Sequence, residues 1–153
     1  MSAMRILECV PNISEGRDEK KIASIVEEVK KLKGVKLLDV SSDKDHNRSV
    51  ITFLGDPAAV RNAALSMAFR AIELIDMREH RGAHPRLGAV DVVPFIPIQG
   101  MDMTEAVQVA RDFGRELGRR GIPVFFTRKQ PTVKREGNSP PSERENMKGF
   151  LRN

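Results

Sequence analysis

The residues best suited to chemistry in this 153-residue chain lie within residues 77–91, a segment dense in histidine, arginine, glycine and proline. His84 directly precedes Pro85, which restricts its backbone, and an imidazole with an ordinary pKa of about 6.5 can accept and return a proton near neutrality. Arg81 and Arg86 offer planar forks that bind carboxylates. The segment predicts general acid and base catalysis on an anionic substrate, the alternative being a long surface loop with solvated charges.

A zinc site is a second interpretation of the same segment, because His80 and His84 are four residues apart. On a helix that spacing would put both rings on one face, but Gly82 and Pro85 argue against a helix there. A third ligand is also lacking, with His46 only a formal candidate. We therefore expect no metal, and we interpret His80 as the end of the preceding helix, where a histidine suits the negative pole.

Two further polar clusters stand near predicted strand ends. The first, CVPNISEGRD (residues 9–18), could present backbone N–H groups and the amide of Asn12 to a ligand, while Cys9 is expected to pack as a small apolar residue. The second, DKDHNR (residues 43–48), sets opposite charges beside a strand start. The alternative for this second cluster is an ordinary charged hairpin turn, since Asp and Asn favour turns.

Composition narrows the class of protein. The net charge of +5 favours anionic partners, but 26 Lys and Arg against 21 Asp and Glu make a mixed surface, which suits a carboxylate-rich metabolite as well as it suits nucleic acid. The absence of Trp and Tyr, and of any nucleic-acid-binding motif, argues against the latter. A single cysteine excludes an internal disulfide, and no apolar run reaches the roughly 20 residues that cross a bilayer. We expect a cytoplasmic protein without a membrane partner.

Periodicity predicts an α+β fold. The predicted strands are residues 5–10, 35–40, 49–54, 91–98 and 122–127, and the helices follow N-caps at Asp18, Asp56 and Thr104. Its first six elements have the βαββαβ order of a ferredoxin-like fold, here extended by a helix and a strand, with an open mixed sheet and helices on one face. Because Pro94 and Pro97 interrupt their strand, we expect it to lie at an edge or to contain a bulge.

The chain is long enough for one domain, which we place at residues 1–127. From residue 128 the composition becomes charged and proline-containing, with almost no core residues. We expect residues 128–153 to be a basic, disordered tail.

Three motifs together resemble a known family. CVPNISEGRD (residues 9–18), DHNRSVITFLGDP (residues 45–57) and LIDMREHRGAHPRLGAVDVVPFIPI (residues 74–98) are similar, in order and position, to the N-terminal subdomain of glutamate formimidoyltransferase, the folate-dependent formiminotransferase of histidine breakdown. The resemblance runs from about residue 5 to residue 126.

The resemblance implies transfer of a formimino group from N-formimino-L-glutamate to N5 of tetrahydrofolate, which is the acceptor substrate. It implies that His84 is the catalytic histidine, with Asp39, Asp43 and Asp45 as alternative carboxylates for the cationic formimino group. The residues that it implies for binding substrate or folate are Asn12, Asp39, Asp45, Asn47, Arg48, Arg81, Gly82, Arg86 and Gly88.

Family enzymes resemble two similar subdomains in tandem, with the ligands between them, and this chain has only the first. It is therefore expected to act as the catalytic half of an enzyme, as a homo-oligomer or with a second-subdomain chain. The alternative is a non-catalytic folate-binding or interaction module derived from that subdomain.

Overall fold

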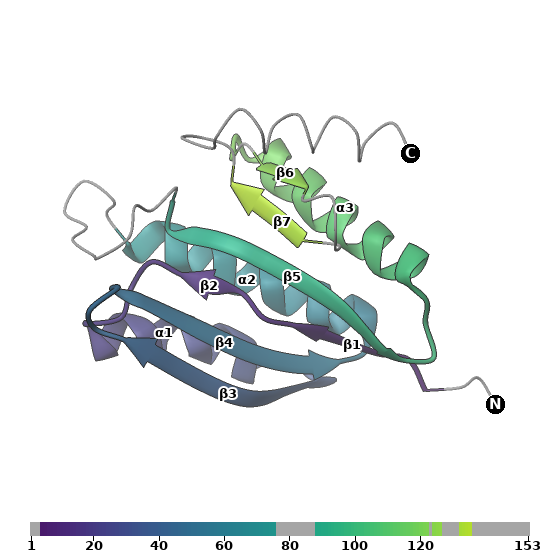
Figure 1. Ribbon diagram of the computed structural model, residues 1–153, viewed down its shortest axis with the longest axis horizontal. Helices are drawn as coiled ribbons and strands as arrows, with labels where there is room; N and C mark the ends of the chain where they lie inside the picture. Colours follow the sequence, from purple (N-terminus) through teal and green to yellow (C-terminus); the bar gives the residue numbers. More distant parts are fainter. Residues whose placement is uncertain (1–3, 76–87, 123, 127–131, 136–153) are drawn as a thin grey trace.

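A computed structural model describes residues 4–75, 88–122, 124–126 and 132–135. Its elements follow one another along the chain as drawn in Figure 1. They are β1 (Ile6–Cys9), β2 (Asn12–Ile13), α1 (Glu19–Lys30), β3 (Val35–Asp43), β4 (Arg48–Gly55), α2 (Pro57–Leu74), β5 (Val90–Gln99), α3 (Met103–Arg119), β6 (Val124–Phe126) and β7 (Thr132–Arg135).

The strands form one sheet in the order β3, β4, β1 with β2, β5, β7 and β6, and every pairing among these described strands is antiparallel. Helix α1 connects β1 and β2 to β3, and α2 connects β4 to β5, so two βαβ units interlock as the ferredoxin-like order requires. The α+β prediction is confirmed. Strand β7 lies between β5 and β6, which separates two strands that would otherwise be parallel neighbours.

The strand rich in prolines, β5, is not at an edge along its first half. It pairs with β1 and β2 on one side, and from Val92 to Pro94 it also pairs with β7 on the other. The expected irregularity is present, because the register shifts opposite Asn12 and again next to Pro97. The carbonyl of Pro94 accepts from the N–H of Val10, so its ring nitrogen faces the junction where β1 gives way to β2 and a missing donor is tolerated.

The helix starts follow the sequence at two of three positions. The Asp18 carboxylate accepts two backbone N–H groups at the start of α1, and Asp56 does the same for α2. Helix α3 begins after Asp102 instead of the predicted Thr104. The reason is a capping box, in which Asp102 accepts the Glu105 N–H at 2.9 Å while the Glu105 side chain accepts the Asp102 N–H at 3.4 Å.

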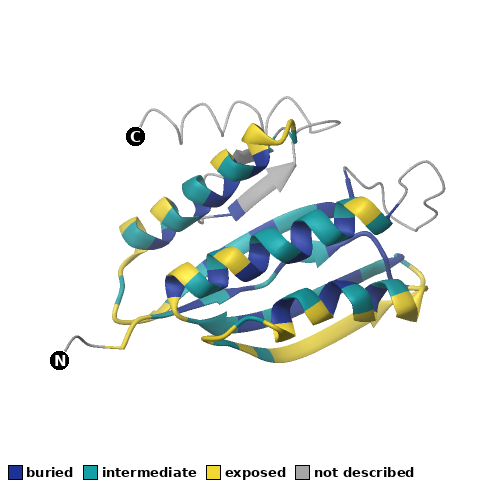
Figure 2. Cartoon of the chain, turned by 180° about the vertical axis from the view of Figure 1, so that it is seen from behind, coloured by how far each residue is buried: buried dark blue, intermediate teal, exposed yellow. Residues whose placement is uncertain are grey.

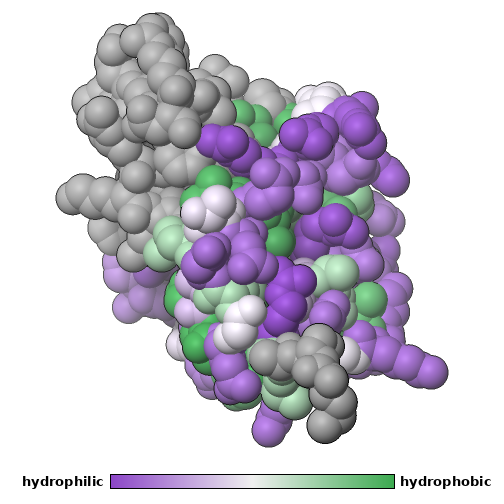
Figure 3. Space-filling model, turned by 90° about the vertical axis from the view of Figure 1, so that its right-hand side faces the viewer, coloured by the Kyte–Doolittle hydropathy of each residue, from purple (hydrophilic) through white to green (hydrophobic). Residues whose placement is uncertain are grey.

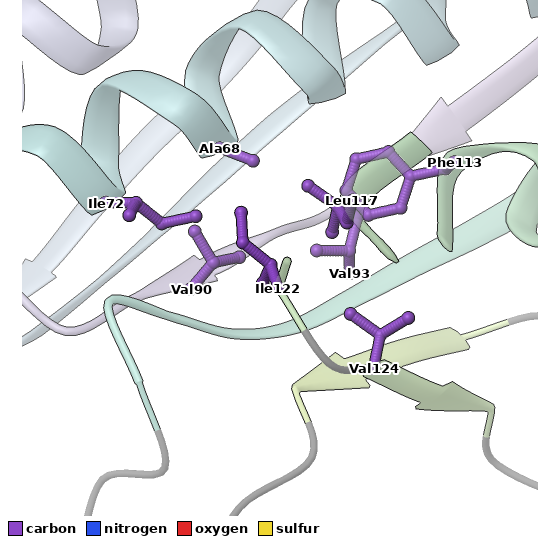
Figure 4. Close-up of a pocket in the computed structure, with 8 residues that line it drawn as sticks. All are labelled: Ala68, Ile72, Val90, Val93, Phe113, Leu117, Ile122 and Val124. Atoms are coloured by element: carbon purple, nitrogen blue, oxygen red, sulfur yellow. The ribbon is translucent and has the colours of Figure 1, made fainter. Parts of the chain in front are cut away.

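The core lies between the sheet and a single layer of helices, seen from behind in Figure 2. Phe53, Phe95 and Phe113 are fully buried there, and each such side chain contributes about 1.5–3 kcal/mol. The rings of Phe95 and Phe113 meet edge to face, with centroids 5.4 Å apart. A cavity of about 10 Å³ remains under α2 and α3 (Figure 4), and its entirely apolar lining gives a water no hydrogen-bond partner.

Strand β7 lies inside the segment that we predicted to be a disordered tail. That prediction was wrong for Thr132–Arg135, which pair with both β5 and β6. Pairing with a neighbouring strand supplies backbone hydrogen bonds that local composition does not reveal. The remainder of residues 128–153 lies outside the described residues.

The opposite end of the sheet from the β3–β4 turn carries a hollow of about 740 Å³, bordered by Arg5, Lys36 and Asp56 around Ile6 and Leu54. Figure 3 views this end, whose surface is mostly hydrophilic with small, separate hydrophobic areas. In the part of the chain that the structure describes, no helix combines the length and apolar character needed to cross a bilayer.

Candidate functional site

The predicted site residues fall into two groups. His80, Arg81, Gly82, His84 and Arg86 lie within residues 76–87, outside the described residues. The others are described, and most of them gather around the end of the sheet where β2 leads into α1 and where β3 turns into β4 (Figure 1). They are Asn12 on β2, Asp39 on β3, Asp45 and Asn47 in the turn, Arg48 at the start of β4, and Gly88 just before β5.

Ser14 ties the loop after β2 to the chain just before β5. Its N–H donates to the carbonyl of Ala89 at 2.8 Å, and its hydroxyl donates to the carbonyl of Gly88 at 2.6 Å. Ser14 is fully buried, so these bonds are shielded from water. They fix the described end of the segment that contains His84 against the first polar motif.

Glu15 organises the next residues of this loop from a buried position. One oxygen of its carboxylate accepts the N–H groups of Arg17, at 3.1 Å, and of Asp18, at 3.0 Å. Its backbone carbonyl accepts the hydroxyl of Ser49, a fully buried residue of β4. Sequence reasoning marked Ser14-Glu15-Gly16 only as a turn or helix approach, and it missed that the acid would bond to its own loop.

Gly16 joins the loop to the β3–β4 turn. Its N–H donates to the side-chain oxygen of Asn47 at 2.8 Å, and Asn47 is itself 7% exposed with a left-handed backbone, φ 52°. A Cβ on Gly16 would come within 2.4 Å of the Asp43 carbonyl oxygen and 2.5 Å of the Arg48 nitrogen. The glycine is therefore required because the two backbones touch at this point.

The turn is also braced from within by Asp43 and His46. The Asp43 carboxylate accepts the N–H of Asp45 at 2.9 Å and of His46 at 3.1 Å, and it contacts the Nδ1 of the His46 ring at 2.5 Å. The hydrogen bond from the His46 side chain is the main cause that lowers the pKa of the Asp43 carboxyl. The sequence placed these residues in a charged turn but did not predict that they pair.

Asn12, Asp39 and Arg48 share the face of the sheet that the helices leave open. Ser49, Ile51 and Phe53 of β4 are buried toward the helices, so the alternate residues of β4 face the other way. Asn12 lies opposite Val50 and Asp39 lies opposite Thr52, and partners in register share a face. An amide, a carboxylate and a guanidinium thus project from one surface, which could bind a polar ligand with carboxylate groups.

Two of the predicted binding residues have structural contacts of their own. The oxygen of Asn47 is bonded to Gly16, and the carbonyl of Gly88 is bonded to Ser14. Ligand binding by either remains a prediction. Cys9 is buried in β1, where burial raises the pKa of its thiol well above the ordinary value, so it packs as an apolar residue as expected.

A metal centre has no support among the residues that the structure describes. None of their His, Cys, Asp and Glu side chains come together in a group of three or more that could hold an ion.

The site and fold define a ligand-binding α+β subdomain in which three polar motifs distant in the sequence meet at one end of a ferredoxin-like sheet. The family described as the formiminotransferase domain, N-terminal subdomain, matches residues 6–149. The chain belongs to this family, as its motifs predicted.

Known relatives agree with this assignment. The chain is 48% identical over 124 residues to glutamate formimidoyltransferase of Thermoplasma acidophilum and 44% identical over 123 residues to that of Streptococcus pyogenes. It is 46% identical over 123 residues to the formimidoyltransferase-cyclodeaminase of Rattus norvegicus. Each match covers 80% of this chain, but only 41% of the first two relatives and 23% of the third.

Proposed function

We propose that this chain supplies the N-terminal half of a folate-dependent active site, which transfers the formimino group of N-formimino-L-glutamate to N5 of tetrahydrofolate in histidine degradation. The observation that carries the proposal is the convergence of the three family motifs. Ser14 bonds to Gly88 and Ala89, and Gly16 bonds to Asn47, so three segments distant in the sequence form one hydrogen-bonded unit.

The chemistry requires one proton to leave and one to arrive. The lone pair of N5 attacks the formimino carbon, and N5 loses its proton as the new C–N bond forms. The bond between that carbon and the glutamate nitrogen then breaks, and this nitrogen gains a proton. We assign both transfers to the imidazole of His84, which yields 5-formimino-tetrahydrofolate and glutamate without any other reactant.

The open face of the sheet provides groups for the two ligands. Arg48, together with Arg81 and Arg86 of the undescribed segment, would bind carboxylates of glutamate and folate. Asp39 and Asp45, both exposed, would offer a negative charge to the cationic formimino group. Asn12 lies between these charges on β2, where its amide donates to the carbonyl of Val10 at 3.1 Å and is thereby oriented.

The rest of the site would come from outside this chain. Because the chain spans less than half the length of its relatives, we infer that a second-subdomain chain or a second copy completes the binding wall. We place the reaction in the cytoplasm, the compartment expected for a chain without a predicted spanning segment.

Calorimetry with tetrahydrofolate, followed by a formimino-transfer assay on the same samples, tests the proposal. The samples are the native chain, His84→Ala, and His80→Ala as a matched control from the same segment. We expect all three to bind tetrahydrofolate with similar affinity. Turnover should fall by about 10²–10⁴-fold in His84→Ala alone, the usual contribution of a general acid and base.

The other outcomes separate the alternatives. Binding without turnover in any sample would favour the non-catalytic folate-binding or interaction module. Absence of tetrahydrofolate binding by the native chain would refute the proposed function.

A further inference from the structure

The β3–β4 turn contains an exposed carboxylate and imidazole that stand apart from the residues assigned above. We propose that Asp43 and His46 are positioning residues, which hold the turn so that it fixes the Gly16 loop and, through that loop, the described end of the segment before β5. The effect on ligand binding rests on the proposed function, but the effect on the loop does not.

The first step is the turn itself. One Asp43 oxygen accepts two successive backbone N–H groups, those of Asp45 and His46, and the other oxygen contacts Nδ1 of His46. The carboxylate therefore closes the turn through three contacts within four residues. A hydrogen bond to a charged group is stronger than a neutral one, which suits a brace at an exposed position.

The second step is the residue that follows. Asn47 has a φ of 52°, a backbone conformation that a closed turn imposes and that asparagine tolerates better than most residues. In that conformation its side-chain oxygen meets the N–H of Gly16 at 2.8 Å. If the turn opened, Asn47 could relax toward negative φ and the bond to Gly16 would be lost.

The third step carries the effect along the loop. Arg17 donates from Nε to the carbonyl of Lys44 at 2.8 Å, so the loop also bonds to the backbone of the turn. Two residues before Gly16, Ser14 bonds to Gly88 and Ala89. A continuous set of hydrogen bonds thus joins Asp43 to the start of β5.

The exposure of the pair distinguishes this role from that of a core contact. The Asp43 and His46 side chains are 47% and 34% exposed, and exposed ion pairs add little to global stability. Removing them should therefore loosen the loop without unfolding the protein. The lowered pKa of the Asp43 carboxyl agrees with a carboxylate that is held in its ionised form by these contacts.

Amide hydrogen exchange by NMR measures the loop directly. The variants are Asp43→Ala, His46→Ala, the double variant, and His46→Asn, whose amide can donate from the position of Nδ1. Lys44→Gln is the matched control, because it changes an exposed charge in the same turn, where only the backbone carbonyl of Lys44 bonds to Arg17. The Val60 amide of α2, bonded to Asp56 at 2.8 Å, reports on global opening.

We expect exchange of the Gly16 amide to rise about tenfold in each alanine variant and no further in the double variant, because the two residues act as a unit. His46→Asn should restore slow exchange, and the Val60 amide should not change. The Kd for tetrahydrofolate should rise about five- to tenfold in the alanine variants, with turnover of the bound complex nearly unchanged.

Unchanged exchange at Gly16, additive effects of the two alanine variants, or failure of His46→Asn to rescue would each overturn the inference. A Lys44→Gln variant as loose as His46→Ala would overturn it as well. If the native chain bound no tetrahydrofolate, the proposed function would fail, and exchange at Gly16 would still decide whether the pair positions the loop.

Discussion

Gly16→Ala is the substitution that tests most directly how closely the loop and the turn are packed. The new Cβ would lie 2.4 Å from the carbonyl oxygen of Asp43, 2.5 Å from the nitrogen and 2.8 Å from the carbonyl oxygen of Arg48. All three atoms belong to the backbone, so no side chain can rotate away. Either the loop or the turn must move, and the bond from Gly16 to Asn47 must lengthen.

The expected loss follows from these contacts. Overpacking at a rigid site costs about 1–3 kcal/mol, and weakening a buried hydrogen bond adds about 1 kcal/mol. We therefore expect the free energy of unfolding to fall by about 2–4 kcal/mol for Gly16→Ala. For a domain of this size that corresponds to a Tm lower by about 4–15 °C, which calorimetry or circular dichroism can measure.

Gly118→Ala is the matched control, since it is the same substitution at a different kind of site. Gly118 is an exposed residue of α3, and a Cβ there would meet nothing within 4 Å. Alanine favours a helix over glycine by up to about 1 kcal/mol, so this variant should be slightly more stable than the native chain. If Gly16→Ala left the Tm unchanged, or if both variants lost stability equally, the close contact of the two backbones would be refuted.

Three further predictions concern other contacts. Ser14→Ala should lower the free energy of unfolding by about 1–3 kcal/mol in denaturant titration, because the carbonyl of Gly88 loses its buried donor; a loss below 0.5 kcal/mol, on the order of an exposed site, would contradict this. Phe113→Ala should cost about 3–5 kcal/mol by the same assay, since it enlarges an existing cavity, and a smaller loss would mean that α3 collapses into the space. His46→Ala should raise the pKa of the Asp43 carboxyl toward its ordinary value in an NMR titration. Because folding lowers that pKa, the stabilisation is complete above the ordinary carboxyl pKa and is lost as the pH falls through the lowered one, and an Asp43 titration that does not respond to His46→Ala would disprove the pairing.

The sequence alone determined the elements whose signals are local. Asp18 and Asp56 were identified as N-caps because a short acidic side chain before an apolar period has one main use at a helix start. The order of strands and helices then left the ferredoxin-like arrangement as the simplest one, and the motifs around His84 indicated the family.

Tertiary structure decided the features that depend on distant partners. Strand β7 exists because β5 and β6 each offer it an unpaired edge, which no property of Thr132–Arg135 reveals. For the same reason β5 lies inside the sheet near Pro94, although its prolines favour an edge. Asp102 replaced Thr104 as the cap because its geometry allows reciprocal bonds with Glu105.

The site shows the same division. The sequence identified three polar motifs, but it could not show that Ser14, Glu15 and Gly16 would bond to the turn and to the start of β5, because those bonds span 31 to 74 residues of chain. Hydrogen bonds of this kind form only once the sheet has brought the strand ends together. Residue type therefore determined what the motifs can do, and the packing of the sheet determined that they act at one place.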